Sequence, residues 1–353
     1  MTPDQPMGRR RLCFLSLNLF FLIIGCGGMP LLLRLYFVHG GRLQWFSAFL
    51  QTAAFPLLLP PLLISAAGGP KFFSLSTSLL FYCFLLGLLS GLVNLFYAYG
   101  LSYLPVSTSS LVLSTQLGFT AVFAFLIVKQ KFTPYTVNAV VLLTIGAVII
   151  GLHSGGNGAT KSAAPRAKHY YAGFGMTIGT AVLDGLLPTL AELMFLKASE
   201  RPSYAVVMEI QLVMGFSATV FCAVGMAVNK DFQSISEEAK GFGLGESQYY
   251  LVIVSFAVVM QCFFLGRVGV VLYSSALLTG IIVDVLLPVT VVLAVIFFDE
   301  PFNSSKAIAL ALALWGFASY IYGETKKAKK EKAPSAKELD EILTISDLNV
   351  ASN

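Results

Sequence analysis

Charged residues are scarce in this chain. Asp, Glu, Lys and Arg make up 12% of its 353 residues, whereas a soluble domain carries about a quarter, so a single water-soluble core is excluded. The sequence has only three histidines and contains no GxSxG, P-loop or HExxH pattern. Their absence excludes the hydrolase, nucleotide-triphosphatase and zinc-protease chemistries that depend on them. We therefore expect neither an enzyme nor a bound cofactor.

Metal-ligand spacing is also lacking. The five cysteines fall in apolar stretches, at Cys13, Cys26, Cys83, Cys222 and Cys262, and we expect buried thiols that form neither disulfides nor metal sites. The net charge of +5 comes from basic residues at the ends of apolar stretches and in the tails, as in membrane proteins. No nucleic-acid motif accompanies them, so nucleic acid is not an expected partner.

Long apolar runs dominate the rest of the chain, which is 56% hydrophobic and has a mean hydropathy of +0.79. Each run is close to the ~20 residues that a helix needs to cross a bilayer. The sequence predicts an all-α polytopic membrane protein with ten transmembrane helices, at about 12–33, 46–67, 77–99, 104–128, 135–152, 170–196, 204–228, 249–265, 273–298 and 306–322.

A polar, Gly- and Ser-rich run at 153–169 divides these spans into two sets of five. An odd number of spans reverses the second set, so we predict two inverted five-helix repeats, 12–152 and 170–323. Lys129 to Phe132 ends the fourth span as Asp299 to Phe302 ends the ninth, and Gly146 and Gly316 follow at the same distance from those phenylalanines. The remaining parts are an N-terminal segment, 1–11, a polar linker, 153–169, and a disordered tail, 324–353.

The distribution of basic residues predicts the orientation. With ten spans and the N-terminus inside, fifteen of the 23 Lys and Arg residues lie on the cytoplasmic side, the side that such residues favour. We expect both termini in the cytoplasm and the protein in the plasma membrane. A homodimer is left open.

Four carboxylates lie inside predicted spans: Asp184, Glu192, Glu209 and Asp284. Because a charge at mid-membrane costs ~2.5–3.5 kcal/mol even on insertion scales, such residues face the protein interior. Asp184 and Asp284 each stand four residues before a proline, which frees the aspartate's own backbone carbonyl. All four are candidates for proton coupling. The alternatives are a permanently neutral carboxyl for the aspartates, and ion pairs with Lys197 or Arg201 for the glutamates.

Neutral polar and aromatic side chains in the spans are candidates for binding substrate, because amides and aromatic rings suit a flat heteroaromatic ligand. The alternative is that they only join helices to one another. These candidates are Asn94, Tyr97, Thr115, Gln116, Gln261, Tyr273 and Trp315.

Several long strings carry a resemblance to a known family. They lie at 28–56, 97–149, 206–214, 286–302 and 314–324, and include RLYFVHGG and LPVSTSSL. In these strings the sequence resembles the plant purine permease family of the drug/metabolite transporter superfamily. The resemblance implies ten helices in inverted halves and proton-coupled uptake of adenine, cytokinins or related nitrogen heterocycles, with alkaloids or vitamin B6-type compounds in some relatives.

One position departs from that pattern. Val291 stands where the family's string usually reads PVTEV with a glutamate, and Asp284 lies seven residues earlier, on nearly the same helix face. We interpret this as relocation of the acid.

The functional hypothesis is a proton-coupled importer of purine-like heterocycles or alkaloids that works by alternating access. An uncoupled facilitator is the alternative in the same class. A sugar-phosphate or nucleotide-sugar antiporter would need a cation deep in the membrane to hold phosphate, and no predicted span has one at mid-depth. A receptor or scaffold would more often carry a folded soluble region.

Overall fold

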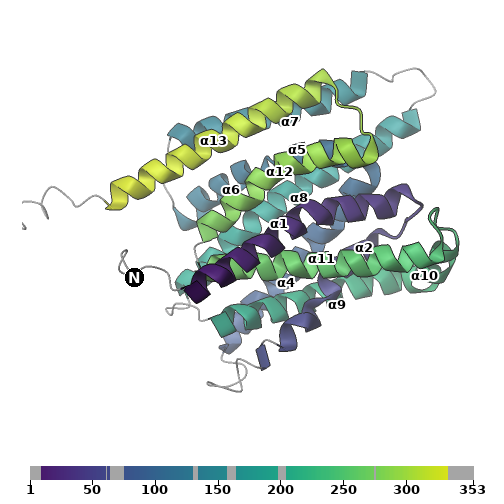
Figure 1. The fold of residues 1–353 in the computed structure, drawn as a ribbon, viewed down its shortest axis with the longest axis horizontal. Coiled ribbons are helices and arrows are strands. Elements are labelled where there is room, and N and C mark those ends of the chain that lie inside the picture. Colours follow the sequence, from purple (N-terminus) through teal and green to yellow (C-terminus); the bar gives the residue numbers. More distant parts are fainter. Residues whose placement is uncertain are drawn as a thin grey trace, which may run out of the picture.

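The computed structural model describes residues 9–60, 62–63, 75–129, 134–156, 164–197, 204–273 and 276–332, and these contain helices but no strand (Figure 1). The elements are α1 (Arg9–Val38), α2 (Gln44–Ala53), η1 (Phe55–Leu58), α4 (Thr77–Tyr103), α5 (Val106–Leu113), α6 (Gln116–Phe123), η2 (Ala124–Val128), α7 (Pro134–Gly156), α8 (Ala164–Lys197), α9 (Tyr204–Asn229), α10 (Asp231–Lys240), α11 (Glu246–Tyr273), α12 (Ala276–Phe298) and α13 (Ser304–Lys332).

Seven stretches of the described helices are long and apolar enough to cross a membrane: Leu15–Val38, Thr77–Tyr103, Val106–Ile127, Lys168–Ala191, Met208–Asn229, Glu246–Arg267 and Ser304–Gly323. Two shorter apolar helices, Pro134–Ile149 and Pro288–Phe298, fall in two further predicted spans. In the predicted span 46–67, Pro56 lies in η1 directly after α2. The predicted class, an α-helical polytopic membrane protein, is confirmed.

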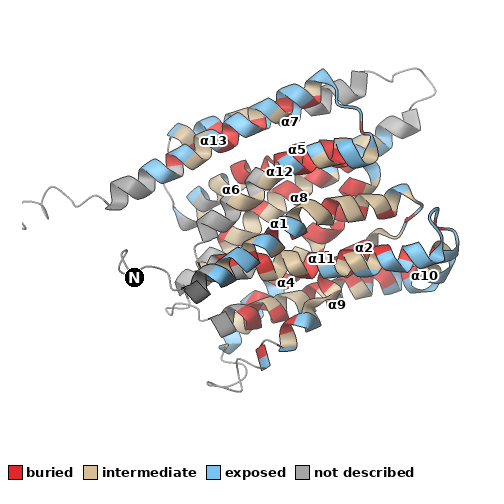
Figure 2. Ribbon diagram, viewed as in Figure 1, coloured by how far each residue is buried: buried red, intermediate tan, exposed pale blue. Residues whose placement is uncertain are grey.

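The outer surface is apolar. Large hydrophobic side chains lie exposed on many helices, including Phe81, Leu126, Ile296, Phe297 and Trp315, each more than 60% exposed. Figure 2 shows exposed residues running along α7 and α13. A surface of this kind would be costly in water but suits contact with lipid.

Two helices approach closely where one of them has a glycine, which has no side chain, at the contact. A Cβ on Gly25 of α1 would lie 2.5 Å from Phe263 Cα of α11, and one on Gly266 would lie 2.5 Å from Leu22 N. Leu22 meets Gly266 and Gly25 meets Phe263, so residue numbers increase along α1 as they decrease along α11. These two helices are therefore antiparallel. The pair α4–α8 is built in the same way, with a Cβ on Gly100 2.5 Å from Thr177 Oγ1.

Helices α7 and α13 form a pair at one edge of the bundle (Figure 1). A Cβ on Gly146 would lie 3.7 Å from Ala309 Cβ, and one on Gly316 would lie 3.4 Å from the carbonyl oxygen of Ala139. The contact is antiparallel and reciprocal, because each glycine meets the alanine that stands seven residues before the other glycine.

The remaining contacts also join helices that are distant in the sequence. Helix α1 packs on α11 and α12, α8 packs on α4 and α6, and α2 and α9 pack on each other. The start of α1 and the end of α13 lie at one end of the bundle, and α10 lies at the other (Figure 1).

Three predicted non-helical regions are partly helical. The polar loop expected at 229–248 contains α10, which is fixed to the first helix: Glu238 accepts hydrogen bonds from Tyr36 Oη at 2.5 Å, Arg42 N at 2.7 Å and Tyr249 Oη at 2.9 Å. Within the predicted linker 153–169, α7 extends to Gly156 and α8 begins at Ala164. In the predicted disordered tail, α13 continues to Lys332, because Ala- and Lys-rich sequence favours helix.

Candidate functional site

The predicted fourth span is a broken helix. Its first half, α5, ends at Leu113 and its second half, α6, begins at Gln116. At the break the hydroxyls of Ser114 and Thr115 donate to the carbonyl oxygens of Leu111 and Val112, at 2.6 and 2.7 Å. These hydroxyls satisfy carbonyls that the helix would otherwise use, which permits irregular backbone at membrane depth. Transporters place substrate beside such breaks.

A close helix contact brings Gln116 to Asp184. Gly185 of α8 lies against α6, and a Cβ there would be 3.0 Å from Thr120 N and 3.2 Å from the carbonyl oxygen of Gln116. The neighbouring Asp184 side chain lies close enough to the Gln116 side chain for a polar interaction. The structure therefore joins a candidate acid and a candidate amide from distant parts of the chain.

Arg267 interacts electrostatically with Asp184, and its guanidinium carbon lies 5.9 Å from the centre of the Phe263 ring. The eighth span is predicted to end near residue 265, two residues before Arg267. Helix α11 instead continues to Tyr273. Arg267 is half-buried and is the last residue of the apolar stretch Glu246–Arg267, and the apolar residues that follow it were the available signal for the longer helix.

Asn94 and Tyr97 lie one turn apart on α4, and both are buried. Tyr97 belongs to the main hydrophobic core and lies close to Cys26 of α1. The backbone oxygen of Asn94 accepts from Gln51 Nε2 at 3.3 Å. Its own amide nitrogen has no hydrogen-bond partner among the described residues, and neither does that of the buried Gln261. Unpaired buried donors of this kind are costly unless a ligand or water binds them.

The other candidates lie differently. Trp315 is 67% exposed on α13 and is not brought to the rest. Glu209 is buried near the start of α9, which packs mainly on α2 and α4. The side chains of Glu192, Tyr273 and Asp284 lie outside the described residues.

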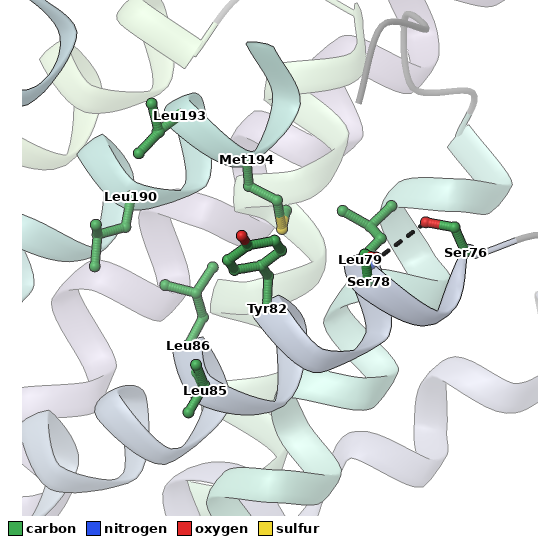
Figure 3. Close-up of a pocket in the computed structure, with 9 residues that line it drawn as sticks. All are labelled: Ser76, Ser78, Leu79, Tyr82, Leu85, Leu86, Leu190, Leu193 and Met194. Atoms are coloured by element: carbon green, nitrogen blue, oxygen red, sulfur yellow. Dashed lines mark hydrogen bonds between the residues drawn. The ribbon is translucent and has the colours of Figure 1, made fainter. Parts of the chain in front are cut away.

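A cavity of about 350 Å³ lies between the start of α4 and the end of α8 (Figure 3). It is lined mainly by leucines, with Tyr82 and Met194, and contains none of the candidate site residues. The Ser76 hydroxyl at its rim already caps α4 by accepting from Leu79 N at 3.4 Å. Its mainly apolar lining does not suit a polar ligand.

The fold and the broken helix define a polytopic α-helical membrane protein with polar side chains gathered inside the bundle. The sequence model of a family described as purine nucleobase transmembrane transport matches residues 13–330, and the chain belongs to this family.

Two relatives from Arabidopsis thaliana are similar over almost their whole length. Purine permease 3 is 43% identical over 92% of this chain and 94% of its own, and purine permease 2 is 47% identical over 90% and 93%. Both are named as permeases and not as enzymes, in agreement with the lack of catalytic motifs. A crystal structure with 15% identity superposes with a TM-score of 0.52, covering 92% of this chain and 99% of its own. That likeness supports the overall fold alone.

Proposed function

We propose that this protein imports purine nucleobases or similar nitrogen heterocycles, such as adenine and cytokinins, in symport with protons and by alternating access. The observation that carries the proposal is the Asp184–Gln116 contact beside the α5–α6 break. It combines a group that can hold a proton with an amide that can bind a ring edge. Family membership supports the substrate class.

The proposed architecture is ten membrane helices in two inverted repeats. In support, residues 170 positions apart play matching roles in the α7–α13 contact: Gly146 and Gly316, Ala139 and Ala309. Lys129 and Asp299, also 170 positions apart, both have positive φ, at 59° and 47°. Positive φ is uncommon outside glycine, so its occurrence at both positions argues for a repeated local structure.

The same symmetry accounts for the wider contacts. If predicted membrane spans five places apart are equivalent, then α1 is equivalent to α8, α4 to α11, and α6 to α12. The contact of α1 with α11 then corresponds to that of α8 with α4, and the contact of α1 with α12 corresponds to that of α8 with α6. The two described ends lie at the same end of the bundle (Figure 1), as an even number of crossings requires. We place this end in the cytoplasm, with the α10 end outside, and assign the protein to the plasma membrane.

For substrate recognition we propose that Gln116, Asn94 and Gln261 bind the nitrogen edges of the ring while Tyr97 contacts its face. Thr115 sets the position of Gln116 by shaping the break. A buried amide nitrogen without a protein partner is suited to a ring nitrogen acceptor. For Trp315 and Tyr273, a role in substrate binding is supported only by the sequence argument.

For coupling we propose Asp184 as the leading proton carrier, with Arg267 as its counter-ion. Protonation would weaken the attraction between the two groups and release Arg267, which gives a carboxyl inside the bundle two distinct states. Asp284, Glu192 and Glu209 are the further candidates.

The test is uptake of radiolabelled adenine into yeast that expresses the chain, with an inward proton gradient and after its collapse. We expect concentrative uptake that the collapse abolishes. Competition by a cytokinin, nicotine-like and benzylisoquinoline alkaloids, and pyridoxine would rank the substrates. Equal uptake with and without the gradient would favour the uncoupled facilitator, and no competition by any purine would contradict the proposed substrate class.

A further inference from the structure

Helix α5 is capped from a distant part of the chain. It begins at Val106 after Pro105, which offers no side-chain cap. Glu300, in the turn between α12 and α13, accepts hydrogen bonds from Val106 N at 2.7 Å and Ser107 N at 3.0 Å, and from the Ser107 hydroxyl. A carboxylate at a helix N-terminus is favoured both by these bonds and by the helix dipole.

A cation completes this arrangement. Lys306, at the start of α13, donates from Nζ to Ser107 Oγ at 2.6 Å and lies 3.8 Å from Glu300 Oε2. Glu300 and Lys306 are both buried, 8% and 9% exposed. Arg34 of α1 interacts electrostatically with Glu300 and donates to the Leu101 carbonyl at 3.0 Å. We call Arg34, Ser107, Glu300 and Lys306 the Glu300 cluster.

A cluster of this kind is a poor way to gain stability. Removing two charges from water costs about as much free energy as their attraction returns, and apolar residues of similar size often stabilise as well or better. A buried ion pair therefore suits a contact that must separate and re-form, because water takes up both charges when they part.

The charged pair Glu300–Lys306 has no charged counterpart in the first repeat. Counting back 170 positions, Gln130 and Thr136 correspond to Glu300 and Lys306, and neither carries a charge. The two ends of the proposed repeat therefore differ in the residues that close them.

The helix contacts also differ between the two halves of the broken fourth span. Helix α5 packs on α12 and also on α13, whereas α6 packs on α8 and α7 and, within the described residues, makes no comparable contact with α12. Helices α5 and α12 therefore close the bundle at the end where Glu300 lies.

From this geometry we infer that Glu300 and Lys306 form the lock of the outer gate, which holds α5 against the α12–α13 turn while the outside is closed. The inference rests on the proposed transport function. Opening to the outside separates Glu300 from the α5 N-terminus and Lys306 from Ser107, and both charges become hydrated. Lys306 is thus a gating residue and does not bind substrate.

A reversible cross-link tests whether this contact opens. The double variant Ser107→Cys/Lys306→Cys is treated with a bifunctional methanethiosulfonate whose spacer is as long as the lysine side chain that it replaces. We expect adenine uptake to stop on cross-linking and to return with dithiothreitol. The single variant Ser107→Cys and the unsubstituted chain, treated likewise, set the background from the five native cysteines. Normal uptake by the cross-linked protein would show a static cap and overturn the inference.

A second measurement needs no substrate. Ser110, one turn below Ser107 on α5, is 3% exposed. In a Ser110→Cys background, Lys306→Met is expected to raise labelling by an impermeant maleimide from outside by at least about tenfold, whereas Lys306→Arg restores the slow rate. Unchanged labelling in Lys306→Met would contradict a gate. If the unsubstituted chain takes up no adenine, the proposed function fails, and the labelling rates still decide the gate.

Discussion

The two halves of the broken fourth segment lie in opposite surroundings. Every residue of α5 is buried, including the four consecutive hydroxyl residues from Ser107 to Ser110. Past the break, α6 runs into the π-helical turn η2, where Phe125 and Leu126 are 46% and 63% exposed. One half is enclosed by protein, and the other is partly exposed on the apolar surface. The comparison teaches that a single apolar run can contain both a polar interior helix and a lipid-facing one, with the candidate site where they meet.

The largest effect is expected from separating α6 from α8. Gly185→Leu places a side chain against α6 backbone at 3.0 Å, and overpacking of this kind costs ~1–3 kcal/mol or more. We expect adenine uptake, normalised to surface expression, to fall by more than about tenfold. Gly175→Leu on the same helix is the matched control, since a Cβ there meets nothing within 4 Å. Equal uptake by both variants would show that the α6–α8 contact does not hold the site.

Asp184→Asn should remove coupling while leaving the contact intact. Asparagine keeps the size and hydrogen bonding of the aspartate but fixes a neutral state. We expect no accumulation of adenine against a gradient and a flat pH dependence, with adenine exchange retained, because only the proton step is lost. The measurement is uptake and counterflow across external pH. The same assay on Asp284→Asn separates the two candidate acids: loss of accumulation there, with a normal Asp184→Asn, would transfer the role to Asp284.

Gln116→Ala should weaken substrate binding. A ring nitrogen left unpaired in a dry site costs ~1–3 kcal/mol, so the apparent KM for adenine should rise roughly 5- to 150-fold. Val122→Ala, on the exposed face of the same helix, should leave the KM unchanged. A normal KM and unchanged substrate ranking in Gln116→Ala would reduce the residue to helix packing.

The smallest effect is expected on the lipid face. Trp315 was a binding candidate, yet it is 67% exposed on α13. Trp315→Ala should therefore change the KM by less than about twofold, as expected of a surface substitution. A large rise in KM, measured under the same conditions as for Gln116→Ala, would place Trp315 in the site.

The apolar runs were sufficient to predict the helical class, because length and hydrophobicity alone decide whether a segment can cross a bilayer. The α5–α6 break was not predictable in the same way. No proline marks it, and it depends on which carbonyls Ser114 and Thr115 bond. The eighth span was predicted to end near residue 265, because a cation at the end of an apolar run normally marks the membrane boundary. The apolar stretch does end at Arg267, but the helix continues to Tyr273. Trp315 shows the converse limit: in a membrane helix, apolar residues occur all round, so periodicity does not tell the inner face from the outer.

The partner of α1 has a consequence for how the chain assembles. The glycine face of the first helix is covered by α11, more than two hundred residues later. Tyr36 and Arg42 bond to Glu238, which follows them by 202 and 196 residues. During synthesis the first helix must remain in the membrane with this face against lipid or another protein until the eighth predicted span is made. Contacts so distant in sequence form slowly and leave intermediates open to misassembly. A chain truncated after α10 should therefore expose Gly25 and Gly28 and be recognised by the cell as unfinished.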